Sequence, residues 1–392
     1  MSGTLSASGD TPSGGHRRRG PAPRMSHPCL WALALLLVSL GCQAAPSTPA
    51  PTAAPVATAT PAATQPPAAA QQPTAAPAAL TVVRVGTLNA TTDAPFYLAQ
   101  DRGYLREEGL DLETTPFDSG QQMVAPLGAD QLDAGGGAVG PGLYNAILRG
   151  INMRIVADRA QSVAGTRFNC LMARKSLLDS GALRTMADLR GRVFAEPVPA
   201  NILTYALERG LNQEGVHLDE VQIVTVPWPE MANAFANGVI DAAFPIEPFV
   251  TQSAERGVAE CWRETADLAP GIETGVLIYG PTFAEQRADA ARRFMVAYLR
   301  AARDYYRAFF GDGQGRAEIV ELMTRITPIK DPALLGRIAP TWLDPNGDVN
   351  TASLRDTQRW YVERGDQETE VDLQRAVDPS FVAFALQRLG RY

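Results

Sequence analysis

The side chains that most often perform catalysis or bind metals are scarce in this chain of 392 residues. Of its three histidines, His16 and His27 lie in an N-terminal stretch that has the features of an export leader, so His217 alone remains in the rest. A histidine-based zinc site or a Ser/His/Asp triad needs partners that this composition does not supply. We therefore predict no catalytic residue, no metal and no cofactor, and expect a protein that is not an enzyme.

A glycine-rich turn is the first candidate binding site. Gly135–Gly140 reads Gly-x-Gly-x-x-Gly between a predicted strand and a predicted helix, with Asp158 at roughly the distance expected in a dinucleotide fingerprint. That fingerprint belongs in the first strand–helix turn of a Rossmann domain, whereas this turn comes later and follows an export leader. We expect instead that Gly136, Gly137 and Ala138 offer backbone N–H groups to a ligand, with a bare tight turn as the alternative.

The loop 89–93 is the second candidate, because it follows the first predicted strand and precedes a helix. Asn89, Thr91 and Thr92 would contact the ligand there, with the threonine hydroxyls and the free amides of the helix N-terminus providing hydrogen bonds. The alternative is that Asp93 simply caps the helix and the loop has no further role.

Three further candidates follow predicted strands in the second half of the domain. Glu196 and Glu247 come directly after short apolar runs, and Trp228 stands between two prolines on a predicted loop. We expect the indole of Trp228 to form a platform for the ligand and Glu247 to accept hydrogen bonds from an amine or ring N–H. The alternatives are a core tryptophan and a solvated carboxylate in a turn.

The N-terminal part is typical of export. Four arginines precede the apolar run Leu30–Leu40, which is too short to span a bilayer, since a spanning helix needs roughly 20 residues. The run Val38–Cys42 resembles a bacterial lipobox, which predicts lipidation of Cys42; ordinary cleavage within 43–46 is the alternative. An uncharged Ala/Pro/Thr tether follows, and Met25 is a plausible start. We expect an extracytoplasmic protein that a lipid anchors to the cell membrane.

The charge of the remaining chain is acidic. Residues 1–80 hold four of the 35 basic and one of the 42 acidic residues, which leaves 31 basic and 41 acidic residues and a formal charge of −10. Nucleic acid needs clustered Lys and Arg, so we exclude it as a partner. Cys170 and Cys261 are the cysteines of this part, and the sequence leaves open whether they form a disulfide or stay as buried thiols.

The elements that must position these residues alternate between strands and helices from Val82 onward. Such alternation predicts α/β lobes with mostly parallel sheets and right-handed crossovers, and a predicted strand over 275–279 closes the second set. Beyond Pro281 the pattern is almost entirely helical. The predicted segments are a signal peptide (1–41), a lipidated tether (42–80), the first part of lobe 1 (81–168), lobe 2 (169–276), and the completion of lobe 1 with C-terminal helices (277–392).

Several motifs in order resemble the solute-binding proteins of ABC importers of the nitrate, sulfonate, taurine and thiamine-pyrimidine type. The matching blocks are Val83–Leu88, Ala94–Ala99, Gly103–Asp111, Leu132–Gly137, Asn145–Gly150, Met186–Val193, Gly238–Ala243 and Glu247–Phe249. This resemblance implies the bilobal type II periplasmic-binding fold, with two crossing strands near 166–173 and 276–279 and a ligand in the cleft. Ile246 departs from the family pattern, which commonly has tryptophan there.

The resemblance also implies partners: a small solute, and the permease and ATPase subunits of an importer, with the binding protein itself a monomer. A flat heteroaromatic solute, such as riboflavin or a thiamine-pyrimidine precursor, suits Trp228 and Glu247 better than an anion does. A sulfonate, taurine or nitrate is the alternative. A thiamine-pyrimidine synthase is a further alternative, but the cysteine-rich run of those enzymes is absent from this sequence.

Overall fold

The computed structural model describes residues 79–392 except Ala138 and Pro328. The predicted signal peptide, the lipidation site Cys42 and the tether as far as residue 78 therefore lie outside the described residues. Within the described part of the chain, no helix is both long enough and apolar enough to cross a membrane.

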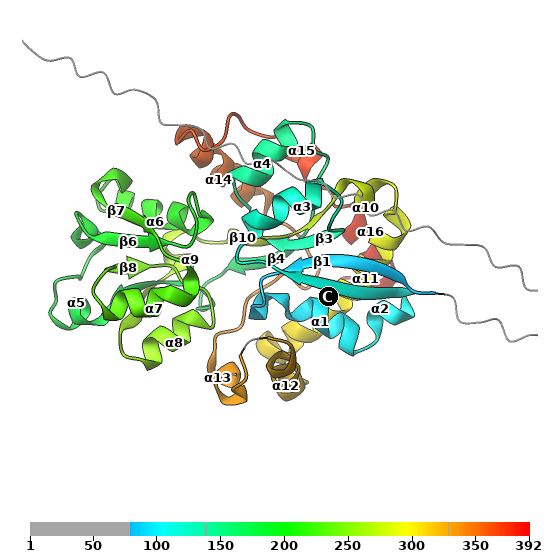
Figure 1. Ribbon diagram of the computed structural model, residues 1–392, viewed down its shortest axis with the longest axis horizontal. Coiled ribbons are helices and arrows are strands. Elements are labelled where there is room, and N and C mark those ends of the chain that lie inside the picture. The colour runs from blue at the N-terminus through cyan, green and yellow to red at the C-terminus, as the bar shows by residue number, and fades with distance from the viewer. Residues whose placement is uncertain (1–78, 138, 328) are drawn as a thin grey trace, which may run out of the picture. The chain divides into compact units, whose positions relative to one another are not determined.

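Five strands form the first sheet, in the order β2-β1-β3-β10-β4 (Figure 1). They are β1 (Thr81–Thr87), β2 (Leu110–Pro116), β3 (Ala134–Gly137), β4 (Arg154–Ser162) and β10 (Ile272–Tyr279). β1 is parallel to β2 and β3, whereas β10 is antiparallel to both β3 and β4. Every side chain of β10 is buried, which is typical of a central strand with both faces covered.

The second sheet has the corresponding order β7-β6-β8-β5-β9. Its strands are β5 (Cys170–Arg174), β6 (Val193–Glu196), β7 (Gln222–Thr225), β8 (Ala242–Ala243) and β9 (Ala259–Glu264). β6 is parallel to β7 and β8, while β5 is antiparallel to β8 and β9. The two sheets confirm the predicted pair of α/β units, although each is mixed rather than mostly parallel.

The chain passes between the two sheets through the segments 163–169 and 265–271. The prediction that 275–279 closes the second set was wrong, because the whole of β10 pairs within the first sheet and its register with β4 begins at Ile272. Polar residues at the start of β10 hid this strand from the sequence pattern. We accordingly propose that lobe 2 ends within 265–271, earlier than the predicted boundary at 276.

Helices cover both sheets (Figure 1). Four helices lie between or beside the strands of the first sheet in the sequence: α1 (Ala94–Asp101), α2 (Tyr104–Glu107), α3 (Val124–Gly128) and α4 (Pro141–Leu148). Five lie between or beside those of the second sheet: α5 (Lys175–Asp179), α6 (Ile202–Gln213), α7 (Trp228–Ala236), α8 (Phe249–Glu255) and α9 (Thr265–Leu268). The C-terminal helices are α10 (Pro281–Glu285), α11 (Ala288–Phe310), α12 (Arg316–Ile326), α13 (Pro332–Arg337), α14 (Thr351–Glu363), α15 (Leu373–Ala376) and α16 (Ser380–Leu389). The long α11 buries one face against α1 and α16 and forms the centre of the largest apolar core.

The irregular segment 338–350, which we call the strap, connects α13 to α14 and runs along the free edge of β4. Backbone bonds from Asp158 N to Gly347 O and from Gln161 N to Trp342 O fix it there. These bonds satisfy the edge of the sheet, which would otherwise present unpaired N–H groups. The strap therefore ties the C-terminal helices to a strand that leads directly into the crossing between the sheets.

A pair of buried carboxyl groups strengthens this attachment. Asp158 accepts a hydrogen bond from Asp344 N (2.6 Å), and Glu273 on β10 accepts one from Asn350 N (2.8 Å). Burial raises the pKa of Asp158 to about 6. Burial also raises the pKa of Glu273 well above its ordinary value, and the negative charge of Asp158 adds to that rise. Both carboxyl groups therefore keep their protons to a higher pH in the folded protein than in the unfolded chain.

The sequence left open whether Cys170 and Cys261 form a disulfide, and the second sheet answers this question. Cys170 on β5 and Cys261 on β9 form a disulfide, with Cα atoms 5.8 Å apart.

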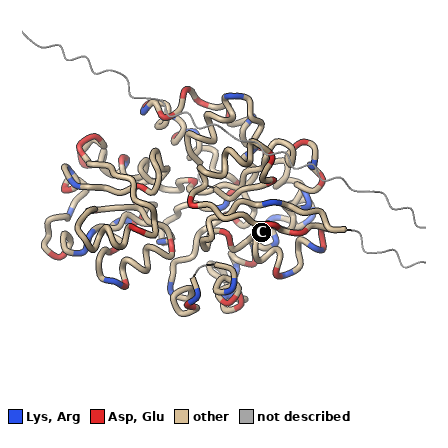
Figure 2. Tube along the Cα trace, in the orientation of Figure 1, with Lys and Arg blue, Asp and Glu red and all other residues tan. Residues whose placement is uncertain are grey.

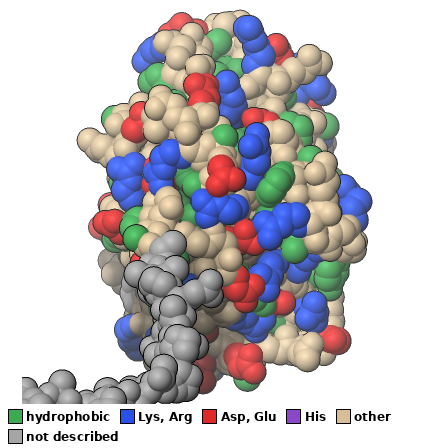
Figure 3. Space-filling model, turned by 90° about the vertical axis from the view of Figure 1, so that its right-hand side faces the viewer, with side chains coloured by type: hydrophobic (Ala, Val, Ile, Leu, Met, Phe, Trp, Pro, Cys, Tyr) green, Lys and Arg blue, Asp and Glu red, His purple; other side chains and the backbone are tan. Residues whose placement is uncertain are grey.

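Acidic and basic positions are interspersed along the chain (Figure 2), and the face in Figure 3 likewise mixes basic side chains with carboxylates. Ion pairs such as Arg102–Asp304 and Arg300–Glu107 account for part of this mixture.

Candidate functional site

Hydrogen bonds to the side chain of Asp93 fix the loop that follows β1. Asp93 ends the short 3-10 helix Thr91–Asp93 and accepts hydrogen bonds from Leu88 N (2.9 Å) and Ala90 N (3.1 Å). These bonds hold the turn around Asn89, which has a left-handed backbone with φ of 52°. Asp93 is the N-cap residue of α1, but its side chain makes no cap hydrogen bond to that helix. It closes the preceding turn instead, and the loop is built around its buried carboxylate.

Arg159 on β4, which was not among the residues predicted to form the site, binds this loop. Its Nη2 donates to Thr92 Oγ1 (2.7 Å) and Asp93 Oδ1 (2.5 Å), and its side chain is only 2% exposed. Burial raises the pKa of Asp93, while the guanidinium and the two backbone N–H groups act in the opposite direction. A signal existed in the sequence, because an arginine inside an apolar strand must find a buried partner.

The first two glycines of the Gly-x-Gly-x-x-Gly run, Gly135 and Gly137, lie in strand β3, and the last, Gly140, is the N-cap residue of α4. A Cβ at Gly136 would lie 2.4 Å from Arg159 Nε, and a Cβ at Gly137 would lie 3.0 Å from the Cα atom of Gly120. Gly136 thus leaves room for the guanidinium, and Gly137 allows a close approach of the backbone. Ala138, the third predicted contact, lies outside the described residues.

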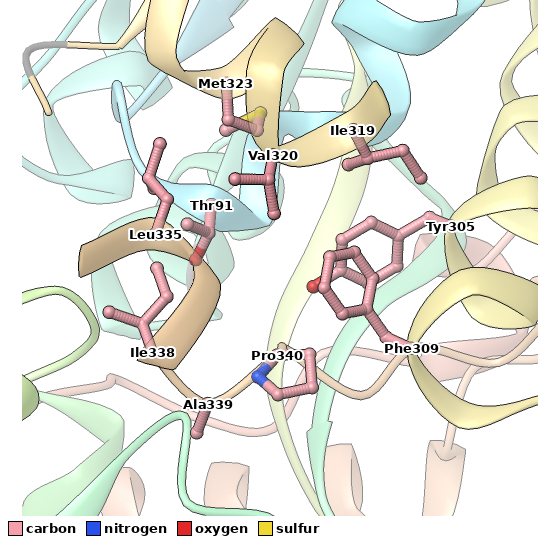
Figure 4. Close-up of a pocket in the computed structure, with 10 residues that line it drawn as sticks. All are labelled: Thr91, Tyr305, Phe309, Ile319, Val320, Met323, Leu335, Ile338, Ala339 and Pro340. Atoms are coloured by element: carbon pink, nitrogen blue, oxygen red, sulfur yellow. The ribbon is translucent and has the colours of Figure 1, made fainter. Parts of the chain in front are cut away.

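Thr91 faces a small apolar hollow beneath the C-terminal helices (Figure 4). Its Oγ1 is buried and has no hydrogen-bond partner among the described residues. The cavity volume is about 20 Å³, which is little more than one water molecule needs. Side chains of α11, α12, α13 and the strap form its walls: Tyr305, Phe309, Ile319, Val320, Met323, Leu335, Ile338, Ala339 and Pro340. The side chains of Thr91 and Thr92 therefore have different surroundings, although we expected both to contact the ligand.

A compact apolar cluster joins the loop after β1 to the second sheet. We call it the junction cluster; it has Ala90, Ala160, Phe168 and Ile246 at its centre, with Leu88, Trp228 and Phe249 packed against them. Its members come from both halves of the chain and from the first crossing segment. Trp228 is half-buried at the first turn of α7 and contacts this cluster as well as the core of the second sheet. The predicted tryptophan platform thus lies where the two sheets approach each other.

Glu196, at the end of β6, is satisfied by the helix that follows it. Its Oε2 accepts hydrogen bonds from Thr204 Oγ1 (2.8 Å) and Asn201 N (3.4 Å) at the start of α6. Burial raises the pKa of this carboxyl, and the hydrogen bonds from Thr204 and Asn201 partly offset the effect. Glu196 therefore orients the turn between β6 and α6.

Glu247 is likewise occupied, and it also connects the second lobe to the strap. Its Oε2 accepts from Thr251 N (3.0 Å), and its Oε1 accepts from Thr251 Oγ1 (2.8 Å) and from Ala339 N (3.1 Å). Burial raises its pKa. The predicted role as acceptor for an amine is therefore replaced, in this structure, by a link between α8 and the segment that lines the hollow beside Thr91.

The structure thus separates the predicted residues into two groups. Trp228 and the loop that contains Asn89 lie at or beside the junction cluster, and Thr92 is tied to the same loop through Arg159. Glu196 and Glu247 form part of the framework, and the lone histidine His217 is exposed and begins a 3-10 turn. Sequence reasoning missed Asn169, which pairs with Ile246 by a β-bridge in the first crossing segment.

Comparisons with known proteins show the family to which this chain belongs. The family model described as "NMT1/THI5 like" matches residues 90–308. A protein of Brucella abortus named as a binding protein is 26% identical over 212 residues, which cover 53% of this chain and 61% of that relative. The match thus spans less than two thirds of the relative.

Solved structures share the fold. The nitrate-binding protein NrtA from Synechocystis has a TM-score of 0.64 at 14% identity, covering 79% of this chain and 89% of its own. The alkanesulfonate-binding protein SsuA from Xanthomonas axonopodis has a TM-score of 0.61 at 18% identity, covering 77% and 99%. The desulfurization enzyme DSZB also has this fold, with a TM-score of 0.55 at 16% identity over 79% and 99%. The fold is that of periplasmic binding proteins, and the chain belongs to the NMT1/THI5-like family.

Proposed function

We propose that this chain is the extracytoplasmic solute-binding component of an ABC importer, which captures a small organic solute and delivers it to a permease and its ATPase. The observation that carries the proposal is the junction cluster, where side chains from both halves of the chain meet beside the loop after β1. Pockets of such proteins lie beyond the carboxyl ends of the strands, and this loop leaves β1 at that end. Family membership and the named binding functions of the relatives support the same role.

The N-terminal part of the proposal concerns anchoring. A lipid on Cys42, followed by the uncharged tether, would keep the domain close to the membrane and within reach of a permease. Mass spectrometry of the mature N-terminus tests this part. A diacylglycerol-modified Cys42 is the expected result, and an unmodified start at Ala44 or Ala45 would refute the anchor.

We propose a flat heteroaromatic solute, such as riboflavin or a thiamine-pyrimidine precursor. The junction cluster supplies apolar and aromatic surface from Phe168, Ile246 and Trp228, which suits a planar ring. The charge of the neighbouring Arg159 is already balanced by Asp93. An anion such as a sulfonate or nitrate is the second candidate, and Arg159 is the observation in its favour.

We propose binding rather than catalysis as the activity. Among the described residues, both cysteines form the disulfide, and the single histidine is an exposed residue of a 3-10 turn. A thiamine-pyrimidine synthase or another enzyme of this fold would need reactive groups at the junction cluster, and the side chains gathered there are aliphatic or aromatic.

Thermal denaturation of the mature domain with riboflavin, pyrimidines, taurine, alkanesulfonates and nitrate tests the proposed solute. A solute at about 100 times its dissociation constant adds about 2.7 kcal/mol to the free energy of unfolding. We expect ring compounds to raise the melting temperature, and Trp228→Ala to reduce that rise. Trp262→Ala, which removes a tryptophan of β9 outside the junction cluster, is the matched control. A rise with sulfonates or nitrate alone would refute the heteroaromatic solute.

A further inference from the structure

Three buried nitrogen donors near the junction cluster have no hydrogen-bond partner among the described residues. They are Trp228 Nε1, Asn169 Nδ2 and Arg159 Nε. The Asn169 and Arg159 side chains belong to residues that are only 2% exposed. Buried donors are almost always satisfied in native proteins, because a donor that has lost its water without a replacement is costly. Three such donors around one cluster indicate a partner that the protein itself does not supply.

The three donors share one location. Trp228 is itself a member of the junction cluster. Asn169 follows Phe168 in the chain and is bridged to Ile246, and both of these neighbours are central members. Arg159 donates to Thr92 and Asp93, in the loop that contributes Ala90 to the cluster. The three donors therefore belong to residues of the cluster or beside it, which come from α7, the first crossing segment and β4.

The acceptors in the same region are already in use. Asp93 accepts from two backbone N–H groups and from Arg159, Glu247 accepts three hydrogen bonds, and Glu196 accepts two. The amide oxygen of Asn169 is also occupied, because Ser162 Oγ donates to it (2.9 Å). What the site has left to offer is therefore N–H donors beside an apolar surface.

We propose that the solute presents carbonyl oxygens on a neutral ring to Trp228, Asn169 and Arg159. This inference rests on the proposed function and names the chemistry that the site recognises. A neutral carbonyl fits better than a sulfonate, because the charge of Arg159 is balanced by Asp93 and an added anion would bury an uncompensated charge. Amine-bearing rings are disfavoured, because the nearby carboxylates of Asp93, Glu196 and Glu247 already accept two or three hydrogen bonds each from the protein.

Calorimetric titration of the mature domain with two single-ring probes tests the proposal. The ring of 1,3-dimethyluracil carries two carbonyl acceptors and no N–H donor, whereas the exocyclic groups of 2,4-diaminopyrimidine are donors. We expect dimethyluracil to bind more tightly. Trp228→Phe keeps a ring and removes one donor, so it should weaken dimethyluracil binding by about three- to tenfold. Trp262→Phe is the matched control and should leave binding unchanged.

A second variant reverses one donor while keeping the shape of the side chain. Asn169→Asp retains the oxygen that Ser162 binds and replaces Nδ2 by a second oxygen. We expect it to abolish dimethyluracil binding and to favour the diamine, and circular dichroism will show whether the variant is folded. Equal or tighter binding of the diamine by the unaltered protein would overturn this inference and leave the proposed heteroaromatic solute in place. Binding of methanesulfonate with neither ring would overturn both.

Discussion

Gly136→Ala is the substitution that best separates a structural role of the glycine run from a role in ligand contact. The added Cβ would lie 2.4 Å from Arg159 Nε and 2.9 Å from its Cδ and Cζ atoms. Real Cβ atoms do not approach other heavy atoms so closely, so the arginine side chain has to move. It has little freedom to do so, because it is 2% exposed and its Nη2 is bound to Thr92 and Asp93.

The size of the effect follows from the two costs that the added methyl group combines. Overpacking a buried site usually costs about 1–3 kcal/mol, and removing one partner of a buried ion pair costs about 3–5 kcal/mol. The guanidinium is displaced but not deleted, so only part of the second cost applies. A gain of about 0.4–1 kcal/mol from the stiffer unfolded chain acts in the opposite direction. We expect the free energy of unfolding to fall by about 2–4 kcal/mol.

Urea denaturation of the ligand-free domain, followed by tryptophan fluorescence, measures this change. Gly142→Ala is the matched control, because Gly142 lies in α4 and an added Cβ there meets no atom within 4 Å. That variant should be as stable as the parent or more stable by up to about 1 kcal/mol. If Gly136→Ala is as stable as the parent and loses only solute affinity, Gly136 is a ligand contact and the reasoning about Arg159 is wrong.

Two further predictions concern stability. The carboxyl pair Asp158 and Glu273 has raised pKa values, so the folded protein keeps a proton that the unfolded chain releases above about pH 4. This difference in proton binding stabilises the folded protein fully below about pH 4, and the stabilisation should be lost as the pH rises through about 6. Chemical denaturation between pH 5 and 8 should show the decline in the free energy of unfolding, and Glu273→Gln should flatten it. Reduction of the Cys170–Cys261 disulfide, whose cysteines are 91 positions apart, should cost about 4 kcal/mol, and an unchanged melting temperature in a phosphine reductant would contradict this.

Much of the fold could be predicted because its local signals are strong. The apolar run of β1, the proline at the start of α4 and the long amphipathic α11 are all visible in a single sequence. β9 has no such signal, since its sequence AECWRE alternates poorly; pairing with β5 and the disulfide hold it in the sheet. The place of β10 in the first sheet is a long-range choice that no local pattern contains.

The candidate site was harder to predict because its partners are distant in the sequence. Arg159 lies 66 residues from Asp93, and no local sequence pattern near either residue predicts that they form an ion pair. Glu247, by contrast, is bound by a threonine only four residues later, at a helix start, and this spacing could have indicated a capping role. Trp228 follows a strand of the second sheet and packs against the junction cluster; its contact with a solute stays a prediction.

The position of β10 also determines the order in which this chain can complete its structure as it is synthesised. β3 and β4 are not neighbours; β10 lies between them and is made only after the entire second sheet. The second sheet occupies the continuous segment 170–264 and can form as soon as that segment is available. The first sheet must wait with two open strand edges until residues 272–279 arrive, so the half that begins first finishes last, and the open edges favour aggregation during this interval.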